Sequence, residues 1–488
     1  MNHWQFEGLL LDMPARGQHS CGCAQVTLGS GGVVEGVVET IPASGVRPDL
    51  LLMPPLANGH DHVRGIRPAA LGGFDLPLEL WLTHMTNIPP VDPYLVACAA
   101  LGRQALSGVG SIMVHYTRPR DATKLGSELA TVARAANTIG IRIAIAVAMR
   151  DINPLGYAPS DRILDGMEAS DRELIRSRLL KTPAPPAEQV RFVDNLAQQI
   201  EGPLVSVQFG PYGMEWCSPE LLRAIAERSA ETGRRVHMHL LESRTQREYL
   251  DSRYPEGPLR FLDRLGMLSP RLSIAHAVWL REDEMELLAE RGVTVAINAC
   301  SNLSLKSGIA PVSAMKRHRV PLAMGLDGFS FDDDDDAFRE LRLNYLLHRG
   351  TAFDSGLPVS DLLHMSSYGG RHSVSGIGAG NGIAEGVEAD LLVLDYAAIS
   401  KDVVVDVDAA HLVARRATAA HVKHLVVSGR EVSRNGRLTS LDLPEVQAEL
   451  DRQTRSGASD FNEWSAVSSR LQARLRQFYE AGLHYCGH

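Results

Sequence analysis

The stretch LLLMPPLANGHDH, residues 50–62, is the part of the sequence that most strongly predicts the fold. Its apolar start, residues 50–53, is typical of a buried strand, and it ends in the triplet His60-Asp61-His62. Alternate residues of a strand point to the same side, so His60 and His62 can direct two imidazoles toward one point. This is half of a metal site, although two solvated loop histidines would give the same pattern. The remaining ligands must come from the ends of later strands.

The composition is that of an ordinary globular protein with a large core, since the 488 residues are 44% hydrophobic and 22% charged. The net charge of −9 gives no reason to expect nucleic acid or an anionic membrane as a partner. We find no apolar run long enough to span a bilayer and no signal peptide at the N-terminus. Six cysteines in so long a chain do not indicate a disulfide framework. We therefore expect a cytoplasmic protein. We also expect it to be a homo-oligomer, a dimer or larger.

Strand-like and helix-like segments alternate over most of the chain. After residues 50–53, the strand-like segments are 110–115, 141–149, 204–209, 236–241, 272–276, 293–297 and 321–325. The helix-like segments between them include 94–106, 125–138, 187–199, 219–232, 257–265 and 282–291. Eight strands in β-α alternation predict a (β/α)8 barrel of the TIM type, in which reactive residues lie at the C-terminal ends of the strands. A doubly wound open sheet is the alternative fold, but no glycine-rich phosphate loop accompanies these strands.

The two chain ends do not follow this alternation. Short strand-like pieces in residues 5–50 cannot bury a core alone, and strand-like sequence returns in residues 384–438. Residues 443–483 have the pattern of an amphipathic helix. We therefore expect three regions: a small β-sandwich domain formed by residues 1–53 with 384–440, the barrel in residues 54–383, and a helical extension in residues 441–488.

Two further segments could bear on function. Residues 150–186 form a long, partly Pro-rich connection after the third strand, and we expect them to be a mobile lid over the barrel mouth. The acidic run 332–336 is best interpreted as a solvated loop in which Asp336 caps the following helix. The alternative is a functional role, in which the negative charge of this run attracts a cationic, amino-rich substrate.

Ionisable residues gather at the ends of the predicted strands. A single histidine there is more often structural, and Asp-Gly alone is a turn. The combination of histidines and an aspartate at the ends of four strands indicates a catalytic metal site. Nitrogen and carboxylate ligands suit Zn²⁺ or Fe²⁺ better than Mg²⁺ or Ca²⁺. The residues concerned are His60, His62, His239, His276 and Asp327, with Glu242 three residues beyond His239.

These segments resemble the amidohydrolase superfamily, in the metal-dependent branch that contains cytosine, guanine, S-adenosylhomocysteine and triazine deaminases and chlorohydrolases. The matching pieces are PPLANGHDH (54–62), DLPLELWL (75–82), HMHLLES (237–243), the segment that begins AHAVWL (275–280), GLDGFS (325–330) and VEADLLVLD (387–395). The resemblance implies a metal held by His60, His62, His239 and Asp327, catalytic roles for Glu242 and His276, and a sandwich built from both termini. The presumed fourth strand carries no lysine, which argues against a two-metal site bridged by a modified lysine.

The function implied is hydrolysis of C–N bonds other than peptide bonds. Hydrolytic deamination of an amino-substituted N-heterocycle (purine, pyrimidine, pterin or triazine-like) would proceed through a metal-bound hydroxide. Asp327 would ligate the metal and accept a proton, His276 would stabilise charge, and Glu242 would protonate a ring nitrogen. The alternative is hydrolysis of an amide, lactam, guanidino or carbon–halogen bond at the same site. A non-enzymatic binding protein would have no need to keep both the ligands and Glu242.

The expected substrate contacts differ from those of the family. Where relatives often have PHAPYT, this chain has PYGMEW at residues 211–216, so Tyr212 replaces a common substrate-contacting histidine. This difference argues against the familiar nucleoside-type substrates. Gln208, Glu215 and Trp216 are further candidate contacts with a small-molecule substrate, although a packing role explains each of them equally well.

Overall fold

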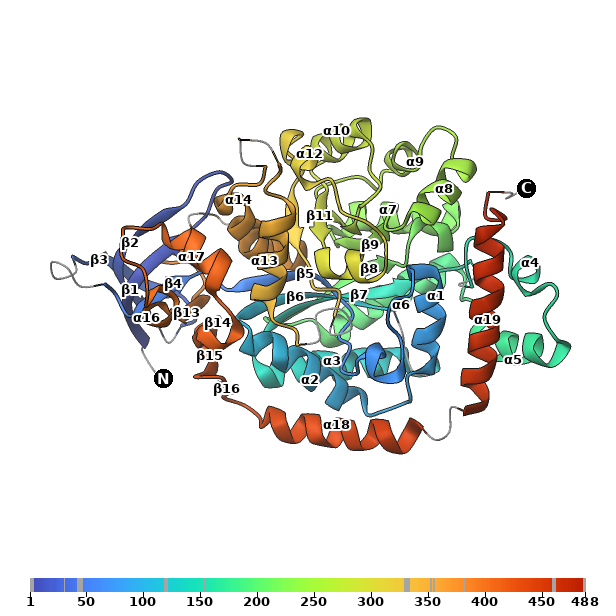
Figure 1. Cartoon of the computed structure of the whole chain (residues 1–488), viewed down its shortest axis with the longest axis horizontal. Coiled ribbons are helices and arrows are strands. Elements are labelled where there is room, and N and C mark those ends of the chain that lie inside the picture. The colour runs from blue at the N-terminus through green and yellow to red at the C-terminus, as the bar shows by residue number, and fades with distance from the viewer. Residues whose placement is uncertain are drawn as a thin grey trace.

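Two eight-stranded sheets organise the chain in the computed structural model. The structure describes residues 4–29, 31–41, 47–117, 122–152, 155–328, 334–351, 353, 356–378, 380, 382–458 and 462–485. One sheet is parallel and nearly closed into a barrel, and the other is built from both chain ends (Figure 1). The barrel strands are β5 (Leu56–Asp61), β6 (Val109–Tyr116), β7 (Arg142–Met149), β8 (Val205–Pro211), β9 (Val236–Leu240), β10 (Leu272–His276), β11 (Thr294–Ile297) and β12 (Leu322–Met324). The predicted (β/α)8 barrel is therefore confirmed.

Helices follow the barrel strands and cover the sheet. Those that begin and end within the barrel region are α1 (Leu78–His84), α2 (Pro93–Leu106), α3 (Leu125–Ile139), α4 (Ser160–Leu164), α5 (Ala169–Leu179), α6 (Pro186–Ile200), α7 (Pro219–Thr232), α8 (Arg244–Arg253), α9 (Pro258–Arg264), α10 (Glu282–Glu290), α11 (Ala299–Ser304), α12 (Val312–Arg317), α13 (Ala337–Leu347), α14 (Val359–His364) and α15 (Gly370–Ser375). None of the helices in the described ranges is long and apolar enough to cross a bilayer.

The first barrel strand is not the one that the sequence suggested. Residues 50–53 form β4 (Leu50–Met53), which pairs with strands of the other sheet, and the barrel begins with β5. Pro54 and Pro55 separate the two strands, because proline has no backbone N–H to donate to a sheet. The apolar run therefore belongs to one sheet, and the histidine triplet to the other.

The second sheet unites the two ends of the chain. Its strand order places β13 beside β4, so N-terminal and C-terminal strands form one continuous ladder. The expected pairing of both chain ends is thus confirmed. Its strands are β1 (Trp4–Asp12), β2 (Ser20–Leu28), β3 (Val34–Glu39), β4, β13 (Leu391–Asp395), β14 (Val422–Val427), β15 (Arg430–Arg434) and β16 (Arg437–Leu438), with α16 (Tyr396–Ser400) and α17 (Ala409–Arg416) between them.

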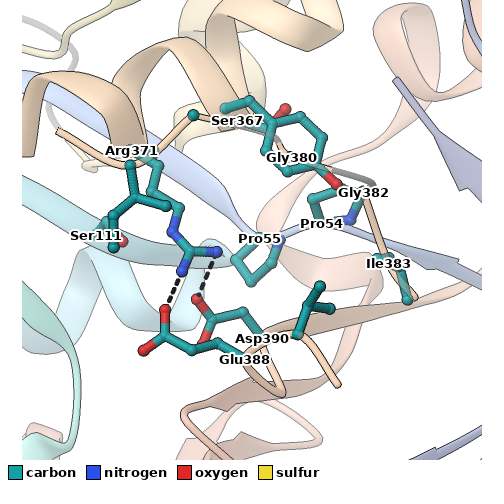
Figure 2. A pocket seen from close by; sticks show the side chains of 15 residues that line it. Pro54, Pro55, Ser111, Ser367, Arg371, Gly380, Gly382, Ile383, Glu388 and Asp390 are labelled. Atoms are coloured by element: carbon teal, nitrogen blue, oxygen red, sulfur yellow. Dashed lines mark hydrogen bonds and ion pairs between the residues drawn. The ribbon is translucent and has the colours of Figure 1, made fainter. Parts of the chain in front are cut away.

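A cavity of about 310 Å³ lies where this sheet meets the barrel. Pro54 and Pro55 line it at the crossing between the sheets, and Arg371 forms ion pairs with Glu388 and Asp390 on its wall (Figure 2). Arg142 of β7 also pairs with Asp390, at 2.8 Å. These ion pairs join the barrel to the segment that leads into β13.

The C-terminal extension consists of two helices rather than the single helix predicted for residues 443–483. α18 (Leu443–Ala458) runs along the barrel and α19 (Asn462–Glu480) crosses to the side of α4 and α5 (Figure 1). Leu471, Leu475 and Phe478 of α19 share an apolar cluster with Ile163 and Ile175 of the 150–186 segment.

The 150–186 segment follows the C-terminal end of β7, as expected of a lid. Its first residues donate backbone hydrogen bonds to the carbonyl of Trp216, and Tyr157 lies against Trp216 with ring centroids 6.3 Å apart. Arg470 of α19 holds Asp171 of α5 with two hydrogen bonds of 2.6 and 2.8 Å. The segment is therefore attached to α19, and its mobility stays a prediction.

The described part of the acidic run serves the fold. Asp336 caps α13 by accepting a hydrogen bond from the backbone N–H of Phe338 at 3.0 Å, as predicted. Asp335 is buried in an ion pair with Arg103 at 2.8 Å, and Asp334 pairs with Arg339. Residues 332 and 333 of the run lie outside the described residues.

Leu475→Ala tests whether α19 holds the 150–186 segment in place. The side chain is fully buried, so its loss should cost about 2–5 kcal/mol and lower the melting temperature. Trypsin should also cut the segment faster at Arg172 or Arg176. The control is Leu346→Ala on α13, where the leucine is 60% exposed and the cost should stay below about 0.5 kcal/mol. Equal cleavage rates in both variants would contradict the attachment.

Candidate active site

The predicted metal ligands meet at the C-terminal end of the barrel. His60 lies in β5 and His62 directly follows it, with ring centroids 4.9 Å apart. The intervening Asp61 accepts hydrogen bonds instead from Asn58 at 2.9 Å and from Gln104 of α2 at 3.0 Å. The triplet therefore directs its two imidazoles, but not its carboxylate, toward the other predicted ligands. We call the group of His60, His62, His239 and Asp327 the ligand cluster.

The donor atoms converge on the carboxylate of Asp327, which follows β12. Its Oδ1 lies 3.3 Å from Nε2 of His60 and 3.1 Å from Nε2 of His62. His239 of β9 completes the group, with its Nε2 3.3 Å from that of His62. Residues from three strand ends thus bring four possible ligand atoms together, as the sequence predicted.

The ligand cluster suits a divalent metal ion. His60, His62 and Asp327 form one group with donor atoms within 4.8 Å of one another, and His60, His239 and His276 form a second. Among the described residues, Nε2 of His60 and Oδ1 of Asp327 are buried yet have no hydrogen-bond partner. Buried polar atoms without partners are costly, and a cation between them would satisfy both.

The pKa shifts of the predicted ligands favour the protonation states that bind a metal ion. Burial lowers the pKa of His62 to about 4, and it lowers the pKa values of His60 and His239 well below the usual value. Burial alone would raise the pKa of Asp327, but the adjacent imidazoles of His60 and His62 hold this pKa well below its usual value. Neutral imidazoles and an ionised carboxylate are the ligating forms.

The other ring nitrogens are engaged with their surroundings. Nδ1 of His62 lies 2.6 Å from the carbonyl oxygen of His115, and Nδ1 of His239 lies 2.6 Å from that of Tyr212. A carbonyl can only accept, so each Nδ1 carries the proton and each Nε2 is free to ligate.

Glu242 and His276 lie beside the ligand cluster. His276, the last residue of β10, has its Nε2 3.5 Å from Oε2 of Glu242 and 3.9 Å from Oδ2 of Asp327. Its Nδ1 lies 2.9 Å from Oδ1 of Asn302 in α11, which orients the ring. Ser301 of the same helix donates a hydrogen bond of 2.5 Å to Oδ2 of Asp327.

Glu242 is a buried carboxyl in a negative environment. Burial raises its pKa well above the usual value, the charge of Asp327 adds to this, and Arg64 opposes it. Its Oε1 has no hydrogen-bond partner among the described residues. A carboxyl with a raised pKa keeps its proton to a higher pH than usual and can act as a general acid.

Three strand ends carry left-handed backbone that is unusual outside glycine. The φ angles are 54° at Leu241, 75° at His276 and 60° at Asp327. Such conformations cost of order 1 kcal/mol or more each and are frequent at functional sites. The turns direct Glu242, His276 and Asp327 toward the same region.

Three of the four predicted substrate contacts, Tyr212, Trp216 and Gln208, lie in different surroundings. Tyr212 packs against Trp216, with ring centroids 6.0 Å apart, and the indole Nε1 of Trp216 is buried without a partner among the described residues. Gln208 donates hydrogen bonds to the carbonyls of Ser373 and Val374 in α15. The structure thus keeps Tyr212 and Trp216 near the ligand cluster and does not bring Gln208 to it.

Glu215 lies near β9, the strand that carries His239. Oε1 of Glu215 accepts a hydrogen bond of 2.5 Å from the side-chain amide of Gln246. The side-chain oxygen of Gln246 in turn accepts a hydrogen bond of 2.6 Å from the backbone N–H of Glu242. The carboxylate of Glu215 sits close to Gly213, which pairs with His239. Burial raises the pKa of Glu215 to about 7, and Oε2 has no partner among the described residues.

Several residues of the site went unpredicted. His115 lies in β6 with its ring stacked on that of His239 at 4.8 Å, and His237 of β9 contacts His60. His115 is the last residue of a predicted strand, so the strand-end criterion could have found it. Arg64, whose Nη1 donates to the carbonyl of Asp327 at 2.8 Å, had no such signal.

Comparisons with known proteins agree with this geometry. The chain is 29% identical over 404 residues to a 5'-deoxyadenosine deaminase from Methanopyrus kandleri, covering 81% of this chain and 84% of that protein. It is 30% identical over 412 residues to a 5-methylthioadenosine/S-adenosylhomocysteine deaminase from Nitratidesulfovibrio vulgaris, covering 82% and 83%.

Solved structures with this fold include a zinc-bound adenosine deaminase from Xanthomonas campestris. It superposes with a TM-score of 0.74 at 25% identity, covering 93% of this chain and 98% of that one. A zinc-bound atrazine chlorohydrolase from Arthrobacter aurescens shares the fold with a TM-score of 0.74 at 21% identity, covering 92% and 99%. The sequence model of the amidohydrolase family matches residues 51–432, and this chain belongs to that family.

Proposed function

We propose that this protein is a metal-dependent hydrolase that deaminates an amino-substituted nitrogen heterocycle. The observation that carries the proposal is the placement of the buried Glu242 carboxyl beside His276 and Asp327, next to the ligand cluster. The names of the two deaminase relatives support the same reaction class.

The metal proposed is a single zinc ion held by His60, His62, His239 and Asp327. Three imidazoles and one carboxylate suit a mononuclear zinc site, and zinc is bound in two structures with this fold. When bound, the ion supplies positive charge that lowers the pKa of a water molecule and polarises the substrate. Fe²⁺ is the alternative ion for the same ligand set.

The protein's own residues then handle the protons. Asp327 stays ionised and can take a proton from the attacking water, while Ser301 fixes the orientation of its Oδ2. His276 can stabilise charge that develops on the substrate, since Asn302 orients its ring. Glu242 can deliver its proton to a ring nitrogen, which makes the adjacent carbon electrophilic, and the proton that Asp327 took from water can then pass to the leaving amine.

Proton delivery by Glu242 favours an amidine-like carbon over a simple amide. An amide carbonyl can be polarised by the metal alone, whereas a C=N carbon becomes electrophilic only when its nitrogen gains a proton. Hydrolysis of an amide, lactam, guanidino or carbon–halogen bond remains the second candidate, and the released product separates the two. The test is to screen the zinc-loaded protein against aminopurines, aminopyrimidines, aminotriazines, pterins and guanidino compounds for release of ammonia.

We further propose that Tyr212, Trp216 and Glu215 contact the substrate. Tyr212 and Trp216 could stack on a flat ring, and the unpartnered Oε2 of Glu215 can accept a hydrogen bond from an N–H group. Gln208 is proposed to have a structural role, because its hydrogen bonds with α15 occupy its amide nitrogen.

His60→Ala and Asp327→Ala test the metal site. Each variant removes one of four proposed ligands, so elemental analysis should find about one zinc per wild-type chain and far less in either variant. Exposed His411 offers a control, and His411→Ala should keep the wild-type metal content. Two tightly held ions per wild-type chain would contradict the mononuclear site.

Glu242→Gln tests the proton transfer. The amide cannot deliver a proton, so kcat should fall by at least about 100-fold on the substrate that the screen identifies, while zinc content and melting temperature stay close to wild type. Activity near that of wild type, or a carboxylic acid released from a simple amide, would replace deamination with amide hydrolysis.

Glu215→Gln tests substrate recognition. A hydrogen bond from a substrate N–H to a carboxylate contributes about 1.5–3 kcal/mol, so kcat/KM should fall roughly 10- to 100-fold with unchanged zinc content. The control is Glu220→Gln at the exposed start of α7, which should leave kcat/KM unchanged. If the Glu215 variant shows the same kcat/KM as this control, Glu215 has only a packing role.

A further inference from the structure

The three proposed histidine ligands use their second ring nitrogen in two different ways. His62 and His239 each face a backbone carbonyl, which can only accept a hydrogen bond. Nδ1 of His60 faces another imidazole instead, Nε2 of His237, at 2.7 Å. An imidazole nitrogen can either accept or donate, so this contact alone does not fix which nitrogen of His60 carries the proton.

The contact between His60 and His237 is a hydrogen bond and not part of a second metal site. His60, His115 and His237 have nitrogens close enough to suggest one. However, two imidazole nitrogens bound to one zinc at the usual bond length would lie about 3.3 Å apart in a tetrahedral site. The observed separation of 2.7 Å is too short for that and typical of a strong hydrogen bond.

Ser273 extends the contact by one more step. Its Oγ lies 2.7 Å from Nδ1 of His237, and the two residues face each other across the β9–β10 pair. The side chains of His60, His237 and Ser273 are all fully buried, so no solvent competes for these hydrogen bonds. The hydroxyl of Ser273 donates to the carbonyl oxygen of Val236 at 3.5 Å, which leaves its Oγ to accept a hydrogen bond from Nδ1 of His237.

We propose that His237 and Ser273 are positioning residues that fix the tautomer of His60 and so set the metal affinity of the site. The proposal rests on the ligand role proposed for His60, whose Nε2 faces Asp327. A ligating Nε2 requires the proton on Nδ1, which donates to Nε2 of His237. His237 is then protonated on Nδ1 and donates to Ser273, whose hydroxyl accepts.

Loss of the Ser273 hydroxyl would leave Nδ1 of His237 without its hydrogen-bond acceptor. His237 could then carry its proton on Nε2 and donate it toward Nδ1 of His60. The proton of His60 would move to Nε2, the nitrogen that faces Asp327, where it blocks metal binding. A serine without contact to any ligand therefore controls whether a ligand is in its binding form.

The test measures zinc affinity by competition with a chelator, together with the visible spectrum of the cobalt-substituted protein. No substrate is needed, so the outcome is independent of the reaction proposed above. His237→Phe should weaken zinc binding by about 10- to 100-fold and change the cobalt spectrum. His237→Gln should restore most of the affinity, because its side-chain oxygen can accept the hydrogen bond from His60.

Ser273→Ala distinguishes a positioning role from a merely structural one. It should weaken zinc binding in the wild-type background but have no further effect when combined with His237→Gln, since an amide has no tautomer for Ser273 to select. Ser111→Ala is the control and should bind zinc normally, because Ser111 is a buried serine of β6 that lines the cavity beside Pro54 and Pro55. The proposal is overturned if Ser273→Ala matches this control, or if His237→Phe binds zinc as tightly as wild type.

Discussion

The close approach of the last barrel strand to the first is the constraint on which the site depends. The backbone N–H of Asp327 donates to the carbonyl of His60 at 2.9 Å, so one hydrogen bond joins two proposed metal ligands that are far apart in sequence. Gly59 makes this approach possible, because a Cβ there would meet the Cβ of Ala323 at 2.9 Å. Asn58 reinforces the closure by accepting a hydrogen bond from the N–H of Leu326 at 2.9 Å.

Closure of the barrel brings together buried polar groups that are rare in an ordinary hydrophobic core. Imidazoles and carboxyl groups share one buried region, and the backbone at His276 and Asp327 is left-handed. Each of these features costs folding free energy, and the large apolar clusters around the barrel offset the cost. The helices and the second sheet therefore contribute to catalysis indirectly, by stabilising a region that is unfavourable on its own.

Sequence patterns predicted what depends on strand periodicity and on the order of elements. The eight alternating units, the pairing of the chain ends and the positions of His60, His239 and Asp327 follow from those patterns, whereas Leu50–Met53 was misplaced because a short apolar strand fits either sheet equally well. Gln208 illustrates a second limit. Its strand position was predicted, but the α15 carbonyls that bind its amide come from 165 residues away, and no local pattern reveals such a contact.

The junction of β4 with β13 also has a consequence for biosynthesis. These neighbours are separated by roughly 340 residues, so a ribosome adding about 5–20 residues per second needs roughly 20–70 s to supply the second strand after the first. Until then one edge of β4 has no partner, and an unpaired apolar edge strand can pair with other nascent chains. The period of greatest aggregation risk therefore ends only when β13, made after the whole barrel, takes its place in the sheet.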